Sequence, residues 1–310
     1  MTTTAIDPGF LRGDRRRQRK EAGIRRIMLG AALISIVVSV LIVGSLVFEA
    51  FSFLVDVNLS ELLSTSGWIP RQNHFDLVTV IVASLWVTGI AMVFATPIGL
   101  ASAVYLSEYS SPGVRRVLKP VLEILAGIPS VVLGYFALRF INPSLVQNVV
   151  GGANNAGNLI AAGLGVGILT IPLVASVSED ALTSVPSSLR EASAGLGAKK
   201  MATTVRIVVP AAVSGLTAAL ILAVSRALGE TMVVFIAGGA ADSAPRVLAP
   251  TEGSLTMTAA MASVASGTDN VAGSGPTFQS LFFIGFVLFC LTLVLNVIAN
   301  RFVQRYRQAY

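Results

Sequence analysis

Two charged side chains stand alone in the longest apolar stretch of the chain. Between Ile207 and Ala241 the only ionisable residues are Arg226 and Glu230, within the segment SRALGET. A charge at the centre of a membrane helix costs roughly 2.5–3.5 kcal/mol on insertion-derived scales, so such residues usually mark a substrate or ion pathway. A guanidinium carries a planar fork of donors that fits the oxygens of phosphate. Arg226 is therefore a candidate anion-binding residue.

Glu230 follows Arg226 by four residues, so the two side chains share one face of an unbroken helix. We expect Glu230 to neutralise Arg226 at rest and to release it when an anion arrives, because transport needs release as well as binding. The alternative is an ion pair that only joins two helices. The hydroxyl residues Ser225 and Thr231 flank the pair, and we assign them to the same pathway.

The composition predicts that this pathway lies in a membrane. The 310 residues are 54% hydrophobic and 12% charged, with a mean hydropathy of +0.78, whereas soluble domains are about 25% charged. The single cysteine, Cys290, excludes an internal disulfide, and the single histidine, His74, excludes histidine-based metal or triad chemistry. The sequence has no GxxxxGK[ST] phosphate loop and no nucleophile–base pair, so we do not expect an enzyme.

Six apolar segments reach the length of about 20 residues that a helix needs to cross a bilayer. They cover residues 27–48, 77–107, 119–138, 159–178, 207–241 and 281–300. With the N-terminus inside, eighteen of the 22 lysines and arginines fall on the cytoplasmic side, which follows the positive-inside rule. The predicted fold class is an all-α membrane protein with six transmembrane helices and both termini cytoplasmic.

This topology divides the chain into three parts. A basic cytoplasmic tail (1–26) precedes the membrane domain (27–300), and a short cytoplasmic tail (301–310) follows it. The membrane domain includes a cytoplasmic loop at 179–206 and an external loop at 242–277. We expect the tail sequence RGDRRRQRK to set the orientation and contact anionic membrane lipids, with no nucleic-acid partner. The segment NPSLVQNVVGGANNAGN, after the third apolar segment, is predicted to be a loop.

Several residues inside the spans have an expected structural role. Gly127, Pro129 and Gly134 predict a kinked third helix that could line a cavity. Glu123 lies near the cytoplasmic end of that helix, where we expect Lys119 to pair with it. In the fourth segment, the small residues of AAGLGVGI predict close packing against a neighbouring helix, in this chain or in a partner.

The loop after the fourth segment predicts a short helix followed by a glycine turn. Pro186 can begin the helix, Gly195 and Gly197 end it, and Pro210 enters the next span. On this pattern alone, a coupling device and a plain structured loop are equally acceptable.

The spacing in this loop resembles the EAA signature of bacterial ABC importer permeases. The matching residues are Glu191-Ala192-Ser193, Gly197, Ile207 and Val209-Pro210, with Ser193 and Val209 as mild departures. The resemblance implies a type I ABC importer permease fold, in which this loop docks on a separate ATPase that holds ATP and Mg, so that this chain itself binds no cofactor. The same resemblance implies that the ATPase contact is formed by Leu189, Glu191, Ala192 and Gly197.

Two further stretches resemble PstC-type phosphate permeases: LEILAGIPSVVLGYFAL at 122–138 and SRALGETM at 225–232. The resemblance implies a phosphate importer of the bacterial cytoplasmic (inner) membrane, assembled from this chain, a PstA-like second permease, two ATPase subunits and an extracytoplasmic phosphate-binding protein. A permease for sulfate or molybdate is the alternative. A self-sufficient channel or secondary transporter would leave the EAA match unexplained.

Overall fold

The computed structural model describes residues 15–64, 66–150, 157–239, 249–266 and 275–306. By its internal contacts the chain forms two compact units, Met1–Glu49 and Ala50–Tyr310. The first unit consists of the N-terminal part of α1 (Arg15–Asp56), whose apolar side chains, such as Ile27 and Leu41, are exposed along the helix. This exposure fits a helix that is solvated by lipid.

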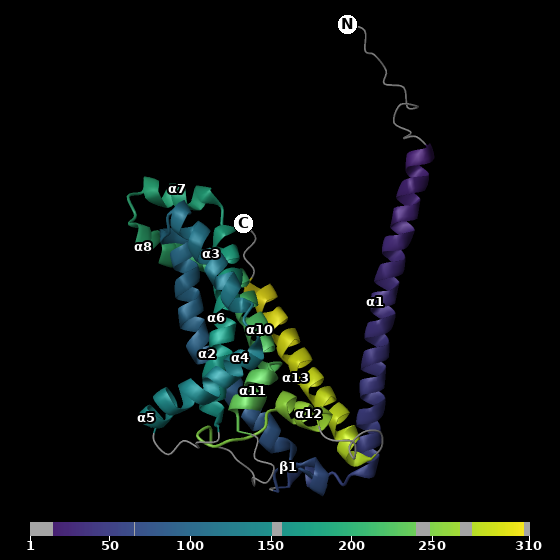
Figure 1. Cartoon of the computed structure of the whole chain (residues 1–310). Helices are drawn as coiled ribbons and strands as arrows, with labels where there is room; N and C mark the ends of the chain where they lie inside the picture. Colours follow the sequence, from purple (N-terminus) through teal and green to yellow (C-terminus); the bar gives the residue numbers. More distant parts are fainter. Residues whose placement is uncertain (1–14, 65, 151–156, 240–248, 267–274, 307–310) are drawn as a thin grey trace. The chain divides into compact units, whose positions relative to one another are not determined.

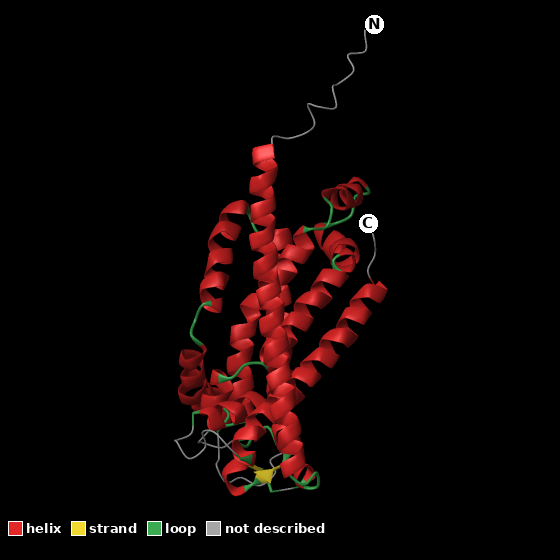
Figure 2. Cartoon of the chain, turned by 90° about the vertical axis from the view of Figure 1, so that its right-hand side faces the viewer, coloured by secondary structure: helices red, strands yellow, loops and turns green. Residues whose placement is uncertain are grey.

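The second unit is almost entirely helical (Figures 1 and 2). Its long helices are α2 (Leu77–Val104, extended by a π-helical turn to Tyr109), α6 (Leu159–Thr183) and α13 (Pro276–Tyr306). Hydrogen bonds from backbone N–H groups to side chains fix where two of them begin: Asp76 Oδ1 accepts from Val78 N, and Asn158 Oδ1 accepts from Ala161 N. A two-stranded sheet, β1 (Trp68–Ile69) and β2 (His74–Phe75), pairs Trp68 with Phe75.

Within the described residues, four helices are long and apolar enough to cross a membrane, and the number rises to six if each of two bent helix pairs counts as one span. The first pair joins Pro112–Ala126 to Ser130–Val150 at 85°, and the second joins Lys200–Ala211 to Val213–Leu228 at 69°. The kink expected in the third segment is therefore confirmed. The pieces of these pairs are α3 (Pro112–Ala126), α4 (Ser130–Phe136) and α5 (Gln147–Val150), then α8 (Lys200–Thr203), α9 (Val209–Ala211) and α10 (Val213–Leu228).

The structure corrects three predictions. The stretch predicted as a loop after the third segment is helical as far as Val150, through a π-helix at Ala137–Val146 and α5; its residues 151–156 lie outside the described part. The fifth segment is not one helix, because it stops at Leu228 and resumes as α11 (Met232–Ala237). The external segment 242–277 contains α12 (Met257–Ala265), whose Met257, Ala259 and Ala260 are fully buried. Periodicity in so short an apolar run does not identify a buried helix.

Two glycines of α6, Gly163 and Gly167, lie against α2 within the same chain. A Cβ on Gly163 would approach the Ile90 side chain to 2.8 Å, and a Cβ on Gly167 would approach Phe94 to 3.0 Å. The expected close packing is therefore confirmed, and its partner is α2. Small residues permit this approach because helix association in lipid depends on van der Waals contact.

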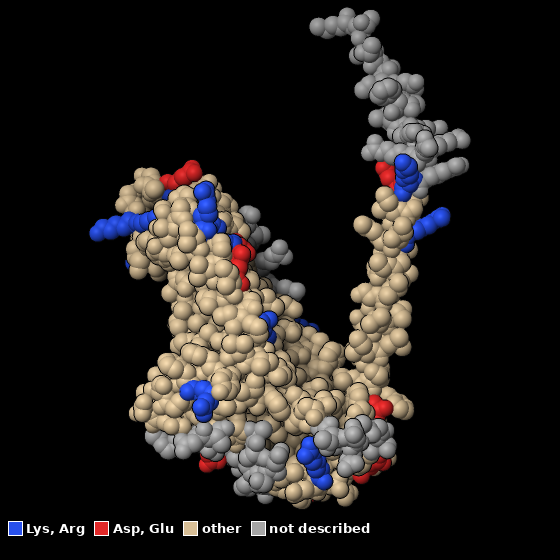
Figure 3. All heavy atoms as spheres, viewed as in Figure 1, with Lys and Arg blue, Asp and Glu red and all other residues tan. Residues whose placement is uncertain are grey.

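Charge is unevenly distributed over the second unit. Lysine and arginine side chains gather at the end that carries α7 (Ser187–Gly195) and α8, and a largely uncharged belt lies beside this end (Figure 3). Such a belt is expected where a protein contacts the hydrocarbon region of a bilayer.

We predict that Gly163→Leu destabilises the protein, whereas Gly89→Leu does not. The new side chain at 163 must push α2 and α6 apart, at about 1–3 kcal/mol for overpacking, while a Cβ on Gly89 of α2 meets nothing within 4 Å. The measurement is the fraction of monodisperse protein left after heating in detergent. Equal losses for the two variants would contradict the packing described here.

Candidate functional site

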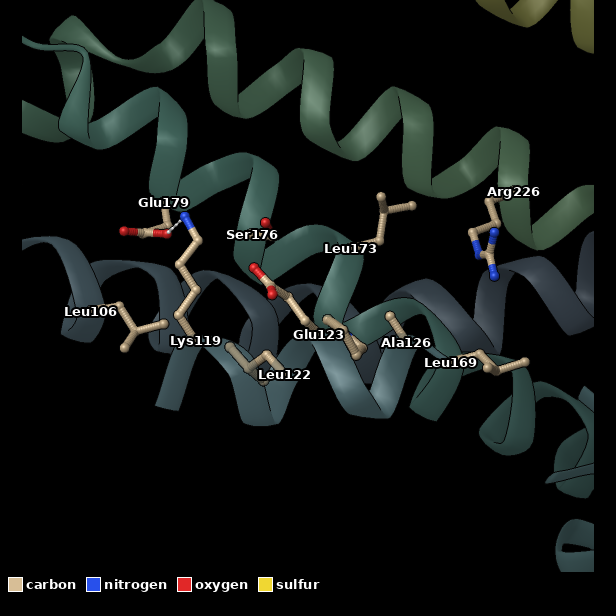
Figure 4. A pocket seen from close by; sticks show the side chains of 11 residues that line it. Leu106, Lys119, Leu122, Glu123, Ala126, Leu169, Leu173, Ser176, Glu179 and Arg226 are labelled. Carbon is tan, nitrogen blue, oxygen red and sulfur yellow. Dashed lines mark hydrogen bonds and ion pairs between the residues drawn. The ribbon is translucent and has the colours of Figure 1, made fainter. Parts of the chain in front are cut away.

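A cavity of about 260 Å³ lies among α2, α3, α6 and α10 (Figure 4). Its walls are mainly leucine, alanine and proline side chains. Arg226 lies at one end, Lys119 and Glu179 lie at the other, and Glu123 and Ser176 lie between them. The cavity therefore combines an apolar lining with a few polar groups, which is the usual form of a small-molecule site.

Arg226 is placed by the end of α10. It belongs to the last turn of that helix, where the carbonyl groups without helical partners favour a positive charge. Arg226 forms no ion pair with any of the described residues. The guanidinium is therefore an exposed cation at the edge of the cavity, as an anion-binding residue should be.

Glu230 does not pair with Arg226, which corrects the expected neutralisation. Gly229 ends α10, so the spacing of four residues no longer places the two side chains on one helix face. The Glu230 carboxylate instead accepts from Val233 N at 3.5 Å, at the start of α11, and its main-chain oxygen accepts from Thr258 Oγ1 at 2.7 Å. A carboxylate at a helix N-terminus is favoured by the helix dipole. Glu230 thus joins the broken fifth span to α12.

The two hydroxyl residues assigned to the pathway do not line the cavity. Ser225 donates to Asn296 Oδ1 of α13 at 3.1 Å, and Thr231 donates to the Gly229 carbonyl at 3.3 Å. Of the four residues predicted for the pathway, the cavity contains Arg226 alone.

A buried carboxylate that the sequence analysis missed lies at the other end of the cavity. Glu179 of α6 is completely buried and binds two cations of α3: its Oε1 accepts from Arg115 Nη2, and its Oε2 accepts from Lys119 Nζ at 2.9 Å. Lys119 also lies 3.2 Å from Asp180 Oδ1. The expected Lys119–Glu123 pair is therefore wrong. Sixty residues separate Lys119 from Glu179 in sequence, and only the packing of α3 on α6 brings them together.

Glu123 faces the cavity, and the helix break follows it in the chain. Within the described ranges, no ion pair is recorded for Glu123, which lines the cavity from α3. Gly127 caps the end of α3 and Pro129 precedes α4, so these two residues form the bend. Gly134 lets α4 approach α11, since a Cβ there would lie 3.1 Å from Met232 O.

The loop that resembles the EAA signature folds as its residues predict. Pro186 precedes α7, and Gly197 adopts φ +77°, the left-handed region that favours glycine. Ser193, at the position where the signature has alanine, is buried and hydrogen-bonded to Thr203 Oγ1 at 2.8 Å. The serine therefore ties α7 to α8, and its departure from the signature leaves the fold of the loop intact.

A partly buried ion pair fixes α7 to the body of the chain. Arg190 Nη2 lies 2.8 Å from Glu108 Oε1 at the end of α2, and the same guanidinium donates to the carbonyls of Leu182 and Val185 at 2.9 and 2.7 Å. By contrast, the outer surface of the loop is exposed. Leu196 and Met201 are 89% and 67% exposed, and Glu191 and Ala192 are exposed as well.

Comparisons with known proteins agree with this architecture. A family model described as binding-protein-dependent transport system inner membrane component matches residues 95–308. A probable ABC transporter permease protein, YqgH, of Bacillus subtilis (strain 168) is 35% identical over 244 residues, which are 77% of this chain and 78% of that protein. The phosphate transport system permease protein PstC of Mesorhizobium japonicum is 30% identical over 317 residues, covering 93% of this chain and 94% of that protein.

Solved structures show the same fold at low sequence identity. A chain of a bacterial alginate ABC transporter, crystallised with a periplasmic protein bound to an alginate pentasaccharide, has a TM-score of 0.65 at 15% identity and covers 93% of this chain and 98% of its own length. A chain of the inward-facing MetNI methionine ABC transporter has a TM-score of 0.55 at 18% identity. The match covers 78% of this chain and 97% of the MetNI chain. The chain belongs to the family of binding-protein-dependent transport system inner membrane components, the permease subunits of ABC importers.

Proposed function

We propose that the chain is the PstC-like permease subunit of an ATP-driven phosphate importer, and that phosphate passes Arg226 on its way through the membrane. The observation that carries the proposal is a cation, Arg226, that forms no ion pair within the described part of the chain and lies at one end of a mainly apolar cavity. The similarity to a phosphate transport system permease over nearly the whole chain supports phosphate as the anion. No observation favours sulfate or molybdate.

The proposed assembly follows from the family and from the charges. A PstA-like second permease would complete the pathway, an extracytoplasmic phosphate-binding protein would deliver the anion, and two ATPase subunits would bind ATP and Mg and perform the hydrolysis. The chain would cross the membrane six times, with each bent helix pair as one span and both termini cytoplasmic. The end of the second unit that carries α7 and α8 then faces the cytoplasm, where the ATPase subunits are.

The exposed surface of α7 is the proposed ATPase contact. Glu191 and Ala192 are exposed on α7, and Gly197 is exposed in the turn that follows it. Leu189 packs inward at the base of the helix. Exposed apolar side chains beside them, Leu196 and Met201, are the kind that become buried when subunits dock.

We predict that Arg226→Ala lowers phosphate uptake at least about tenfold, because a hydrogen bond from a charged group contributes about 1.5–3 kcal/mol. Arg226→Lys should retain part of the uptake, since it keeps the charge and loses the two-pronged geometry. Arg139→Ala is the matched control, because Arg139 is exposed and lies outside the cavity.

The measurement is labelled-phosphate uptake into membranes in which assembly of the complex has been verified. Unchanged uptake in Arg226→Ala would refute the pathway. Competition by unlabelled sulfate or molybdate as strong as that by phosphate would refute phosphate as the substrate.

We predict that Gly197→Val weakens binding of the ATPase, whereas Gly195→Ala does not. Neither glycine has an atom within 4 Å of an added Cβ, and only Gly197 has positive φ. A side chain there costs about 1–2 kcal/mol, so the turn after α7 should change and the yield of copurified ATPase should fall about tenfold. Equal yields from both variants would show that the turn is not part of the contact.

We predict that Arg190→Met uncouples ATP hydrolysis from transport, because α7 loses its attachment to the end of α2. The change leaves the buried carboxylate of Glu108 unpaired, so the double variant with Glu108→Met should regain part of the lost stability. The measurement is phosphate transported per ATP hydrolysed. Arg206→Gln, a change at an exposed arginine nearby, should leave this ratio unaltered; a fall as large as that in Arg190→Met would contradict the specific role of the pair.

A further inference from the structure

A second cavity, of about 440 Å³, adjoins the first at the start of α3. The two cavities share three lining residues, Leu106, Lys119 and Glu123. The second is also lined by Arg115 and Ser107, among others. Cationic side chains therefore line the two adjoining cavities, from Arg226 past Lys119 to the arginines at the start of α3.

The cations along this route differ in how they are neutralised. Arg226 has no recorded ion-pair partner within the described ranges, whereas Arg115 and Lys119 each bind one oxygen of the Glu179 carboxylate. Lys119 has Asp180 as a second partner at 3.2 Å. An anion at Arg226 meets a bare cation, and an anion at Arg115 and Lys119 must first take the place of a carboxylate.

The position of Glu179 makes such an exchange possible. Its carboxylate is completely buried on α6, while the side chains of Arg115 and Lys119 are 37% and 32% exposed on the cavity side. A phosphate in the second cavity can therefore reach Arg115 and Lys119, which line it, whereas Glu179 is not among its lining residues. A bound anion leaves a site readily when its cations have another partner to return to.

We propose that Lys119 and Arg115 form an exit station for the transported oxyanion, with Glu179 as the counter-ion that the anion displaces and that expels it again. The proposal rests on the phosphate path past Arg226. If Glu179 only held α3 against α6, it would form the same ion pairs. The test must therefore measure anion occupancy as well as stability.

The test uses the reporter variant Ser107→Cys, since Ser107 lines the second cavity, in a Cys290→Ser background and in the complete transporter in lipid nanodiscs. The reaction of the reporter thiol with a neutral thiol reagent is followed as inorganic phosphate is added, with chloride at matched ionic strength as the control. The native Cys290, in protein without the reporter, should react at a rate independent of phosphate, because it lies on α13 away from both cavities.

Phosphate should slow the reaction of the reporter thiol. The concentration for half-protection should fall about tenfold in Glu179→Gln, which frees the cations, and should rise about tenfold in Lys119→Gln, with recovery in Lys119→Arg. Absence of protection beyond chloride, or equal protection in Lys119→Gln and Lys119→Arg, would overturn the proposal. If Glu179→Gln does not assemble, the two lysine variants decide alone.

The uptake assay separates this proposal from the proposed function. Protection of the reporter together with normal uptake in Arg226→Ala would refute the path past Arg226 and keep an anion site at α3. Loss of uptake in Arg226→Ala without any protection of the reporter would keep the path and refute the exit station.

Discussion

The hydrogen bond from Thr258 Oγ1 to the Glu230 carbonyl satisfies the backbone where the fifth span is broken. In a membrane, a backbone group without a partner costs several kcal/mol, so a helix can stop there only where protein supplies the missing bonds. The carboxylate of Glu230 bonds the first turn of α11, and α12 supplies the hydroxyl. The break in turn ends α10 just after Arg226 and so gives that guanidinium a place beside the cavity. The position of Arg226 at the cavity depends on this local solution.

The sequence alone predicted which segments form membrane helices better than it predicted where those helices break. Runs of apolar residues identify α2, α6 and α13 because length and hydropathy are local properties. The break at Gly229 is stabilised by Thr258, a residue 28 positions away from Glu230, so a glycine within the run does not predict it alone. The bend of the third span was predictable from the sequence, because Gly127 and Pro129 are strong local signals for a helix break. Helix α12 was missed because its apolar residues are too few for a span and its burial depends on neighbours.

The charged residues show the same limit. Arg226 could be found because an isolated charge in an apolar run is conspicuous, and its assumed partner was wrong because helical spacing does not survive a glycine stop. Glu179 lies at the end of an apolar run, where a charge costs little and draws no attention. Its importance follows from complete burial and from two cations contributed by another helix. A search for acids at one span end facing cations at the next would have found it.

The contacts that hold the cavity and those that hold α7 meet on one stretch of chain. Glu179 binds the cations of α3, and the carbonyls of Leu182 and Val185, three and six residues later, bind the guanidinium of Arg190. Any displacement of α7 must therefore break these hydrogen bonds or move the end of α6 with it. The second alternative shifts the Glu179 carboxylate relative to Lys119. A partner that moves α7 would thus change the neutralisation of these cations without touching the cavity, because both sets of contacts share the end of one helix.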